Sequence, residues 1–310
     1  MLKLLLISKD TSTFLNKNYF YLENELFKNT DLMIWRESGD IEYILKQVPK
    51  IPDFILIIND IGTEFYPIIS GLPKTQIPFG LVVNDSHRFI AERKKYISQN
   101  NIKNFIVLSK QNFLKYYPEQ RNKQIFFFPP FVNTEVYKDY NLDKNMDLMM
   151  LGDKVSPIYP LRKAIDRYYK SDPRYVSMPH PGWKNFTKEQ EQNTLMGKNY
   201  AQFINRAKLF FTCGSVLQVL TYKYFEIPAC KTLLLAPTFP ELEQIGFVPG
   251  KHFVDINLQN FAAKAEYYLK NTVERNRITE EGFKFVQQYH SHIYRTEQLV
   301  KKMIEICNQQ

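Results

Sequence analysis

The chain has 310 residues, of which 44% are hydrophobic, 24% charged and 15% aromatic. This length suits one large domain or two ordinary ones, and the composition excludes a disordered tail and a collagen-like repeat. Forty-one Lys and Arg residues against 32 Asp and Glu residues leave a formal charge of +9, which favours anionic partners such as nucleotide phosphates, nucleic acid or an anionic membrane surface.

The three cysteines, Cys213, Cys230 and Cys307, are an odd number without C-x-x-C spacing. This pattern argues against a disulfide framework and thiolate zinc sites, and it suits a reducing compartment. The longest apolar runs, such as residues 54–58, have the length of a strand, and the run at 4–7 is too short for a signal-peptide core. We therefore expect a cytoplasmic protein that at most contacts a membrane peripherally.

In the first half of the chain, short apolar runs alternate with stretches of helical spacing. Strands are predicted at 2–8, 32–36, 54–59, 79–84, 105–108 and 125–128, and helices at 15–28 and 88–99. Continuous apolar strands that alternate with helices are typical of parallel sheets covered on both faces.

The pattern restarts after Pro129-Pro130 and a polar stretch at 138–147. Strands are predicted at 148–151, 175–178, 209–212, 232–236 and 252–256, and helices at 160–169, 189–206, 239–244, 261–270, 275–289 and 294–307. We interpret the chain as an α/β protein with two Rossmann-like domains that face each other across a cleft. Ligands of such sheets bind at the carboxyl ends of the strands.

We assign residues 1–138 to the first domain, 139–290 to the second, and 291–310 to a final helix that packs back towards the first. Several motifs are absent from the sequence. It contains no G-x-G-x-x-G after the first strand, no P-loop, no G-x-S-x-G, no H-E-x-x-H and no D-x-D. A phosphate site without a metal would depend on positive charge and helix amino termini instead.

The first candidate site, Asn84-Asp85-Ser86-His87-Arg88, directly follows a predicted strand. At the strand's carboxyl end, His87 can exchange a proton and Asp85 can hold its ring, which makes both catalytic candidates. The alternative is structural: Asp85 or Ser86 caps the following helix, with His87 in its first turn.

The second candidate site runs from Gly152 to Arg162 after the strand at 147–151. A glycine at the strand end allows a ligand to approach the backbone, and Ser156 or Tyr159 would cap a helix that has proline in its first turn. Arg162 and the exposed amides could clamp a diphosphate. The alternative is an ordinary loop with a solvated arginine.

The third candidate site contains Tyr222, Lys223 and Glu226, between two predicted strands. In a helix, Lys223 and Glu226 lie on one side, where a cation can bind phosphate and a carboxylate can accept two ribose hydroxyls. The alternative is a surface ion pair worth under ~1 kcal/mol, with the neighbouring aromatic residues in the core.

A fourth stretch, Met178-Pro179-His180-Pro181-Gly182-Trp183, is a loop after a strand, and His180 is a candidate to contact a ligand there. His290 and His292 are interpreted as solvated residues at a helix end. Five scattered histidines give little support to a metal site, so none is predicted.

The third site carries a resemblance to a known family. The stretch 222–235, YKYFEIPACKTLLL, resembles the R-x-F-E-x-x-A-x-G-x-x-L-L element of GT-B glycosyltransferases, and more narrowly the spore maturation protein CgeB-like branch. Residues 247–254 are similar to the F-x-x-G-x-E-x-V turn of that branch, and 290–299 to its H-x-Y-x-x-R final helix. Residues 128–133 are similar to the segment that leads out of the first GT-B domain.

The sequence departs from the family pattern at three positions. Lys223 stands where arginine is usual, Lys231 replaces a glycine, and Gln218 occupies the position of the first of two glutamates. The lysine keeps the charge but loses the bidentate fork of arginine. The glutamine puts the stereochemical outcome in question, because that glutamate normally contacts the donor sugar.

The resemblance implies a metal-independent glycosyltransferase, presumed by analogy to move a hexose, that uses a UDP-, GDP- or TDP-sugar as donor and no cofactor. Glu226 would hold the ribose, Lys223 and Arg162 the diphosphate, and Asp85 and His87 would face the reacting sugar and a glycan, protein or small-molecule acceptor. A retaining mechanism is favoured over an inverting one. Two alternatives stay open: a phage-type enzyme that glucosylates DNA, and a binding protein without turnover.

Overall fold

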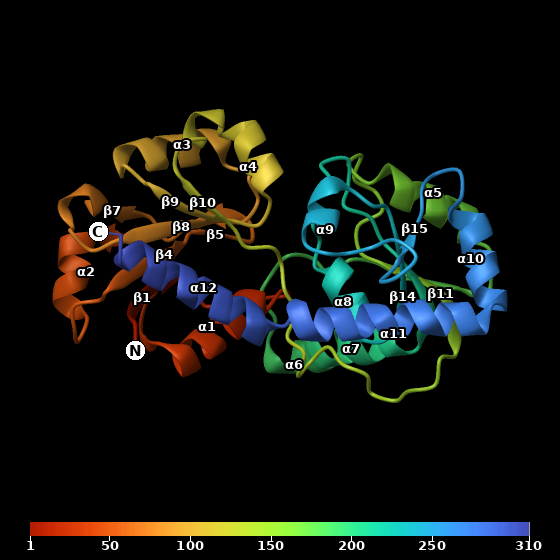
Figure 1. The fold of residues 1–310 in the computed structure, drawn as a ribbon. Coiled ribbons are helices and arrows are strands. Elements are labelled where there is room, and N and C mark those ends of the chain that lie inside the picture. The colour runs from red at the N-terminus through yellow and green to blue at the C-terminus, as the bar shows by residue number, and fades with distance from the viewer. Residues whose placement is uncertain (310) are drawn as a thin grey trace. The chain divides into compact units, whose positions relative to one another are not determined.

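The structure, a computed structural model, describes residues 1–309, which divide into two compact units (Figure 1). Unit 1 consists of residues 1–13 and 17–129 together with the chain from Ile293 on. Unit 2 consists of Phe14–Asn16 and Pro130–His292. Each unit contains one main parallel sheet with helices around it, so the predicted α/β class with two Rossmann-like domains is confirmed.

The main sheet of unit 1 has the strand order β10-β9-β8-β4-β1-β2. The strands are β1 (Lys3–Ser8), β2 (Asp31–Trp35), β4 (Phe54–Ile58), β8 (Phe79–Val83), β9 (Asn104–Val107) and β10 (Gln124–Phe127). The central strand β4 is at most 1% exposed along its whole length, because helices cover both faces of a parallel sheet. This burial explains its uninterrupted apolar sequence.

The helices and minor strands of unit 1 connect these strands. The helices are α1 (Asn18–Asn29), α2 (Ile41–Gln47), α3 (Ile90–Gln99), α4 (Lys110–Tyr116) and α12 (His292–Cys307), with 3₁₀ turns η1 (Leu72–Lys74) and η2 (Pro118–Gln120); the two-residue strands are β3 (Gly39–Asp40), β5 (Asp60–Ile61), β6 (Glu64–Phe65) and β7 (Ile69–Ser70). Helix α3 connects β8 to β9, and α4 connects β9 to β10, so both connections step along the sheet in the same direction and the two helices lie side by side on one face (Figure 1).

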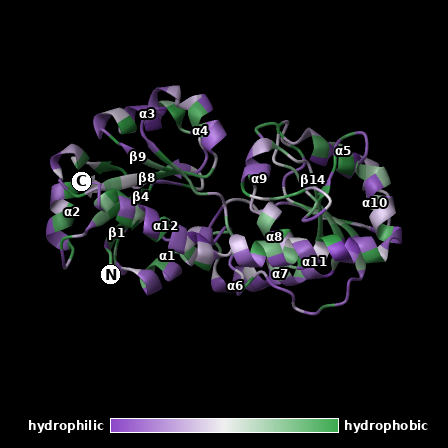
Figure 2. Ribbon diagram, viewed as in Figure 1, coloured by the Kyte–Doolittle hydropathy of each residue, from purple (hydrophilic) through white to green (hydrophobic). Residues whose placement is uncertain are grey.

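The sheet of unit 2 has the strand order β12-β11-β13-β14-β15. Its strands are β11 (Met146–Leu151), β12 (Tyr175–Met178), β13 (Ala207–Phe211), β14 (Leu233–Ala236) and β15 (Val254–Asp255), and its helices are α5 (Pro160–Tyr169), α6 (Lys188–Gln192), α7 (Gly197–Asn205), α8 (Lys223–Ala229), α9 (Pro240–Gln244), α10 (Phe261–Lys270) and α11 (Thr272–Tyr289). Apolar side chains of α5 and α10 form one core with β11, β13 and β14. In Figure 2 the strands of both units are mainly green, as expected for buried apolar segments.

The last two helices, α11 and α12, belong to different units. Helix α11 packs against α8 and β14 of unit 2, whereas the chain from Ile293 on belongs to unit 1. Leu299 and Met303 of α12 are fully buried, and the Cys307 thiol donates a hydrogen bond to the Asp53 carbonyl, 3.4 Å away. None of the helices in residues 1–309 combines the length and the apolarity that a membrane span requires.

Some local predictions were wrong. The predicted helix at 189–206 is interrupted after Gln192, giving α6 and α7, and helices α2 and α4 were not predicted. His290 and His292 are buried rather than solvated, at 0% and 1% exposure. His290 lies among the rings of Phe225, Phe247 and Phe285, so packing against aromatic rings explains its burial.

Candidate active site

Three of the predicted donor-binding residues meet at the carboxyl end of β11. Gly152 has a left-handed backbone, with φ +112, and a Cβ placed on it would lie 3.4 Å from Lys223 Nζ and 3.6 Å from Arg162 Nη1. The two cations therefore converge on a strand end that carries no side chain. Two cations beside a backbone position without a side chain suit the binding of a diphosphate.

Arg162 is held in this place by the elements around it. Its side chain is buried, and its Nη2 donates to the Thr212 hydroxyl at 3.2 Å and the Cys213 carbonyl at 3.0 Å. The guanidinium also lies over the Tyr159 ring, 4.0 Å from its centroid. Tyr159 is the N-cap residue of α5 and Pro160 its first residue, as the sequence indicated, although the Tyr159 side chain makes no capping hydrogen bond.

Helix α8 presents Lys223 and Glu226 on one side, one turn apart. Burial, together with the nearby Arg162 cation, lowers the pKa of Lys223 to about 8, and Glu226 offsets part of this shift. Burial raises the pKa of Glu226 to about 7, against the opposing effects of Lys223 and a hydrogen bond from Tyr137. Both groups thus titrate close to neutral pH, which is frequent at functional sites.

The surroundings of Glu226 contain residues that the sequence analysis missed. Tyr137 donates a hydrogen bond to the Glu226 carboxylate, and the ring of Tyr200 packs edge-on against Tyr137 at 6.2 Å. Burial and the Glu226 charge raise the pKa of Tyr200 well above its usual range. Tyr137 lies 89 positions before Glu226, so no short motif could have joined them.

The other two donor-binding candidates lie at the margin of this cluster. His180 accepts a hydrogen bond at Nδ1 from the Gly182 amide, 3.0 Å away, and its ring packs on Trp183 at 4.9 Å. Burial lowers the pKa of His180, and the charges of Lys223 and Arg162 lower it further. Tyr222 is the N-cap residue of α8 and half-buried.

Lys231 shows how this chain accommodates a departure from the family pattern. It stands where the motif has glycine, and its backbone keeps a left-handed conformation, with φ +52. Its ammonium pairs with Asp139 at 3.1 Å and with Glu280 at 3.3 Å, and these contacts compensate for the unfavourable backbone. The turn after α8 is thus retained without glycine.

The two catalytic candidates belong to unit 1. Asp85 and His87 follow β8 in a loop, and Asp85 pairs with Arg88 at 3.8 Å. The predicted capping alternative was wrong: α3 begins at Ile90, and its N-cap residue is Phe89, which has φ +49 and no capping side chain. His87 therefore lies in the loop before the helix and is half-buried.

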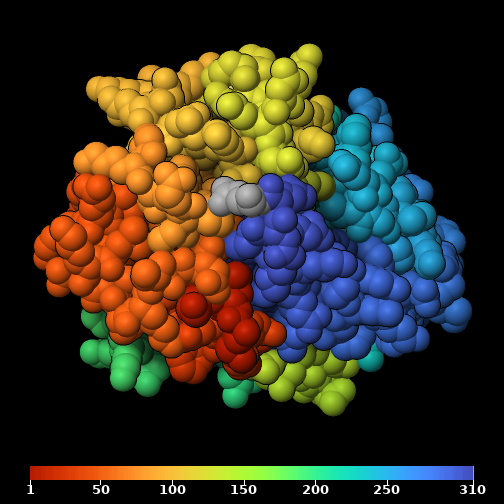
Figure 3. Space-filling view, turned by 60° about the vertical axis from the view of Figure 1, so that its left-hand side comes forward, coloured from red at the N-terminus to blue at the C-terminus, as the bar shows by residue number. Residues whose placement is uncertain are grey.

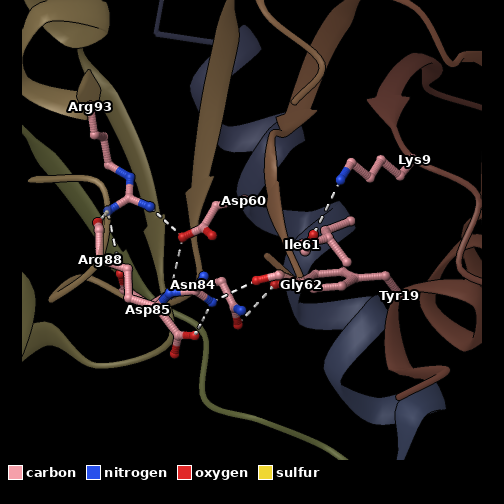
Figure 4. A network of polar contacts seen from close by, with 9 residues as sticks. All are labelled: Lys9, Tyr19, Asp60, Ile61, Gly62, Asn84, Asp85, Arg88 and Arg93. Carbon is pink, nitrogen blue, oxygen red and sulfur yellow. Dashed lines mark hydrogen bonds and ion pairs between the residues drawn. The ribbon is translucent and has the colours of Figure 1, made fainter. Parts of the chain in front are cut away.

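A buried ion pair beneath this loop was also missed. Asp60 follows β4, the neighbour of β8, and its Oδ2 pairs with Arg93 of α3, with side-chain exposures of 1% and 0% (Figure 4). Burial raises the pKa of Asp60 to about 6, against the opposing charge of Arg93. The available signal was Asn59-Asp60 after an apolar strand, the same position that drew attention to Asp85.

Within residues 1–309, no group of three His, Cys, Asp or Glu side chains is arranged to hold a metal ion. The three cysteines are free, and Cys213 and Cys230 are buried.

Comparisons with known proteins bear on the second half of the chain and on the fold. The model of a family described as glycosyl transferase-like matches residues 160–301, which include Arg162, His180, Tyr222, Lys223 and Glu226. A comparison with curated protein sequences gave no match.

Solved structures match the whole chain at low identity. HepE from Anabaena, in a complex with UDP and glucose, is 11% identical with a TM-score of 0.65, over 98% of this chain and 100% of that one. A sucrose-phosphate synthase from Thermosynechococcus elongatus is 10% identical with a TM-score of 0.68, over 100% of both chains. An α-glucosyltransferase in complex with UDP-glucose and DNA containing an abasic site is 11% identical with a TM-score of 0.62, over 97% and 98%.

The family model matches less than half of the chain, so it shows a similarity of residues 160–301 to glycosyl transferase-like proteins, whereas the solved structures show that the whole chain has the GT-B fold. These matches confirm the predicted fold class and support the prediction of a glycosyltransferase. The narrower CgeB-like branch stays a prediction.

Proposed function

We propose that the chain transfers a sugar, a hexose in the simplest case, from a nucleoside-diphosphate sugar to an acceptor hydroxyl of a glycan, a protein or a small molecule. The observation that carries this proposal is the convergence of Lys223 and Arg162 on Gly152, with Glu226 one turn further along α8. The two cations would then hold the diphosphate, which lies between the ribose and the sugar of the donor, and Glu226 would hold the ribose. UDP is the first nucleotide to test, because HepE and the α-glucosyltransferase were solved with UDP or UDP-glucose.

The chemistry follows from the charges. The acceptor oxygen forms a bond to the anomeric carbon, while the bond from that carbon to the diphosphate oxygen breaks. Lys223 and Arg162 stabilise the charge that develops on the diphosphate, a role that is most effective when the cations are already fixed in place. In this proposal Lys223 and Arg162 stabilise the leaving diphosphate, and the reaction needs no metal ion.

Asp85 and His87 are the proposed catalytic residues of unit 1. In an inverting reaction, one of them removes the proton of the acceptor hydroxyl. In a retaining reaction, which we favour, His87 positions the sugar and the departing phosphate takes that proton. We propose residues 1–138 as the acceptor-side domain and residues 139–290 as the donor-side domain. The three free cysteines fit our proposal of a cytoplasmic enzyme.

A thermal-shift panel of UDP, GDP, ADP and TDP tests donor binding. A ligand at 100 times its Kd adds about 2.7 kcal/mol of stability, which we expect as a rise of several degrees in Tm. Glu226→Ala should remove the rise, whereas Glu243→Ala, which truncates an exposed carboxylate of α9 in the same unit, should keep it. If no nucleotide shifts the Tm of the wild-type chain, the proposal is wrong.

A second acceptor, DNA, is favoured by the distribution of charge. Residues 88–123 contain nine Lys or Arg and two Asp or Glu, so this segment carries a net +7 of the total +9. We use the name basic face for the exposed Lys and Arg side chains of this segment that form no ion pair with a carboxylate in residues 1–309. They are Lys95, Lys103, Lys110, Lys115, Arg121 and Lys123. In the part of the chain that the structure describes, no carboxylate pairs with any of them. Figure 3 shows the segment as a gold-to-yellow surface at the top of unit 1.

The chemistry of the basic face suits a phosphate backbone. The segment 88–123 contributes none of the exposed large hydrophobic residues of the described chain. Insertion into a membrane and stacking on single-stranded bases both require such side chains, whereas contacts to duplex phosphates require only cations. The structure of the α-glucosyltransferase contains DNA with an abasic site, so it is an example of a protein with this fold in complex with DNA.

Fluorescence anisotropy with a 30-base-pair duplex over a range of salt concentrations tests this second acceptor. Changing Lys95, Lys103 and Lys115 to Gln should lower the slope of log K against log salt by about 2–3. The same change at Lys251, Lys264 and Lys270 of unit 2 should leave the slope unaltered. Absence of duplex binding at low salt would leave glycans, proteins or small molecules as acceptors.

A further inference from the structure

The loop that carries Asp85 and His87 rests on a buried guanidinium. Arg93 projects from the first turns of α3, and its Nη1 donates to the Arg88 carbonyl at 2.8 Å and to the Asp85 carbonyl at 3.3 Å (Figure 4). One side chain thus contacts both ends of the four-residue segment 85–88. It is fully buried, so these contacts are shielded from water.

Asp60 completes the arrangement from the neighbouring strand. Its Oδ2 pairs with Arg93 Nη2 and also accepts a hydrogen bond from the Asp85 amide at 3.4 Å. The carboxylate therefore contacts the loop directly and orients the guanidinium that holds the loop's carbonyls. Arg93 gains one more contact, a hydrogen bond from the same Nη1 to the Tyr117 hydroxyl at 2.8 Å.

The loop has a geometry that requires such support. Phe89, its last residue before α3, has φ +49, which is unfavourable for an aromatic residue. Strained backbone persists only where surrounding contacts determine it, and it clusters at functional sites. A buried ion pair contributes little net stability compared with apolar packing, so fold stability alone does not account for this one.

We propose that Asp60 and Arg93 are positioning residues, which fix the loop of Asp85 and His87 in its working conformation. The proposal depends on the proposed function only for its catalytic consequence, since the positioning of the loop can be measured without turnover. Displacement of a reacting group by about 1 Å can cost a factor of about 100 in rate, so the pair would act strongly on turnover and not on donor binding.

The test uses the double variant Asp60→Asn/Arg93→Gln. Asp60→Asn alone leaves a buried guanidinium without its carboxylate and endangers folding, whereas the double variant removes both charges. Hydrogen exchange of the amides at 84–89 should become at least tenfold faster, while the amides of β8 keep their rates. UDP release from UDP-glucose, with water as acceptor, should fall at least tenfold, and the Tm shift by UDP should persist.

Tyr117→Phe is the matched control, because it removes a contact of Arg93 and leaves those to the loop. It should keep wild-type exchange at 84–89 and wild-type UDP release. The proposal is overturned if the double variant exchanges normally at 84–89, or if exchange accelerates equally throughout unit 1, which would indicate general destabilisation. If the exchange result holds and no nucleotide raises the Tm of the wild-type protein, the proposed function fails and the positioning role stands.

Discussion

Gly152 and Lys223 lie so close that a methyl group on the glycine would be in van der Waals contact with the ammonium: the distance from an added Cβ to Nζ is 3.4 Å. An added methyl group would therefore occupy the space between the end of β11 and the Lys223 ammonium. This relationship joins a strand end and a helix that are 71 positions apart in the sequence.

Gly152→Ala should abolish the UDP-induced rise in Tm, because the methyl group occupies the approach to Lys223. The substitution also forces alanine into a φ of +112, at a cost of about 1–3 kcal/mol. Gly250→Ala is the control: its φ is +74 and nothing lies within 4 Å of the added Cβ, so it has the strain without the obstruction. Retention of the UDP shift in Gly152→Ala would disprove the placement of the diphosphate.

Nucleotide affinity should depend on pH with a maximum between about 7 and 8. Glu226, whose pKa is raised to about 7, must be ionised to accept ribose hydroxyls, so affinity falls below pH 7. Lys223, whose pKa is lowered to about 8, must be protonated to bind phosphate, so affinity falls above pH 8. Calorimetric titration with UDP measures both limbs. Glu226→Gln should remove the acid limb, and a flat wild-type profile would contradict these roles.

Lys223→Met should raise the stability of the free protein and abolish UDP binding. The folded-state pKa of Lys223, about 8, is below its ordinary value of 10.5, so the unfolded chain binds the proton more tightly, and wild-type stability falls as the pH decreases from 10.5 to about 8. Below pH 8 the variant avoids this cost, on the order of 1–3 kcal/mol. Chemical denaturation at pH 7 and pH 10 checks the sign: the advantage of the variant should shrink at the higher pH.

His87→Ala should lower transfer at least 100-fold and leave the UDP-induced Tm shift intact, because His87 lies in unit 1 and the donor-binding residues lie in unit 2. Glu92→Ala, an exposed residue of α3, is the control and should retain transfer. UDP release in the presence of UDP-glucose measures both variants. Equal activity of His87→Ala and the wild type would remove His87 from the mechanism.

Much of the fold could be predicted from local sequence, because buried parallel strands are short apolar runs and the candidate residues follow them. The runs at 54–58 and 79–83 became β4 and β8, and the segment 261–270 became α10 with the expected bounds. The joint role of Gly152, Arg162 and Lys223 was implied by the resemblance to GT-B glycosyltransferases, and the structure places the three residues together.

Features that depend on long-range contacts could not be predicted. Asp60 and Arg93 are 33 positions apart, and a basic residue in an exposed helix is ordinarily solvated, so nothing local marked Arg93 as buried. His290 is buried by rings from three other segments. The helix start at Ile90 was missed because a strained Phe89 takes the place of the expected polar cap.

The chain passes from unit 1 to unit 2 near residue 130 and returns near residue 292, where Val132 and Ser291 form a parallel bridge. Neither unit is therefore one contiguous piece of polypeptide. A fragment that ends at residue 129 would lack α12 and leave bare the apolar surface that Leu299 and Met303 cover, so it would be prone to aggregate. Co-expression of 1–129 with a peptide of 293–309, or a circular permutant that joins them, would be needed to obtain the amino-terminal unit in isolation.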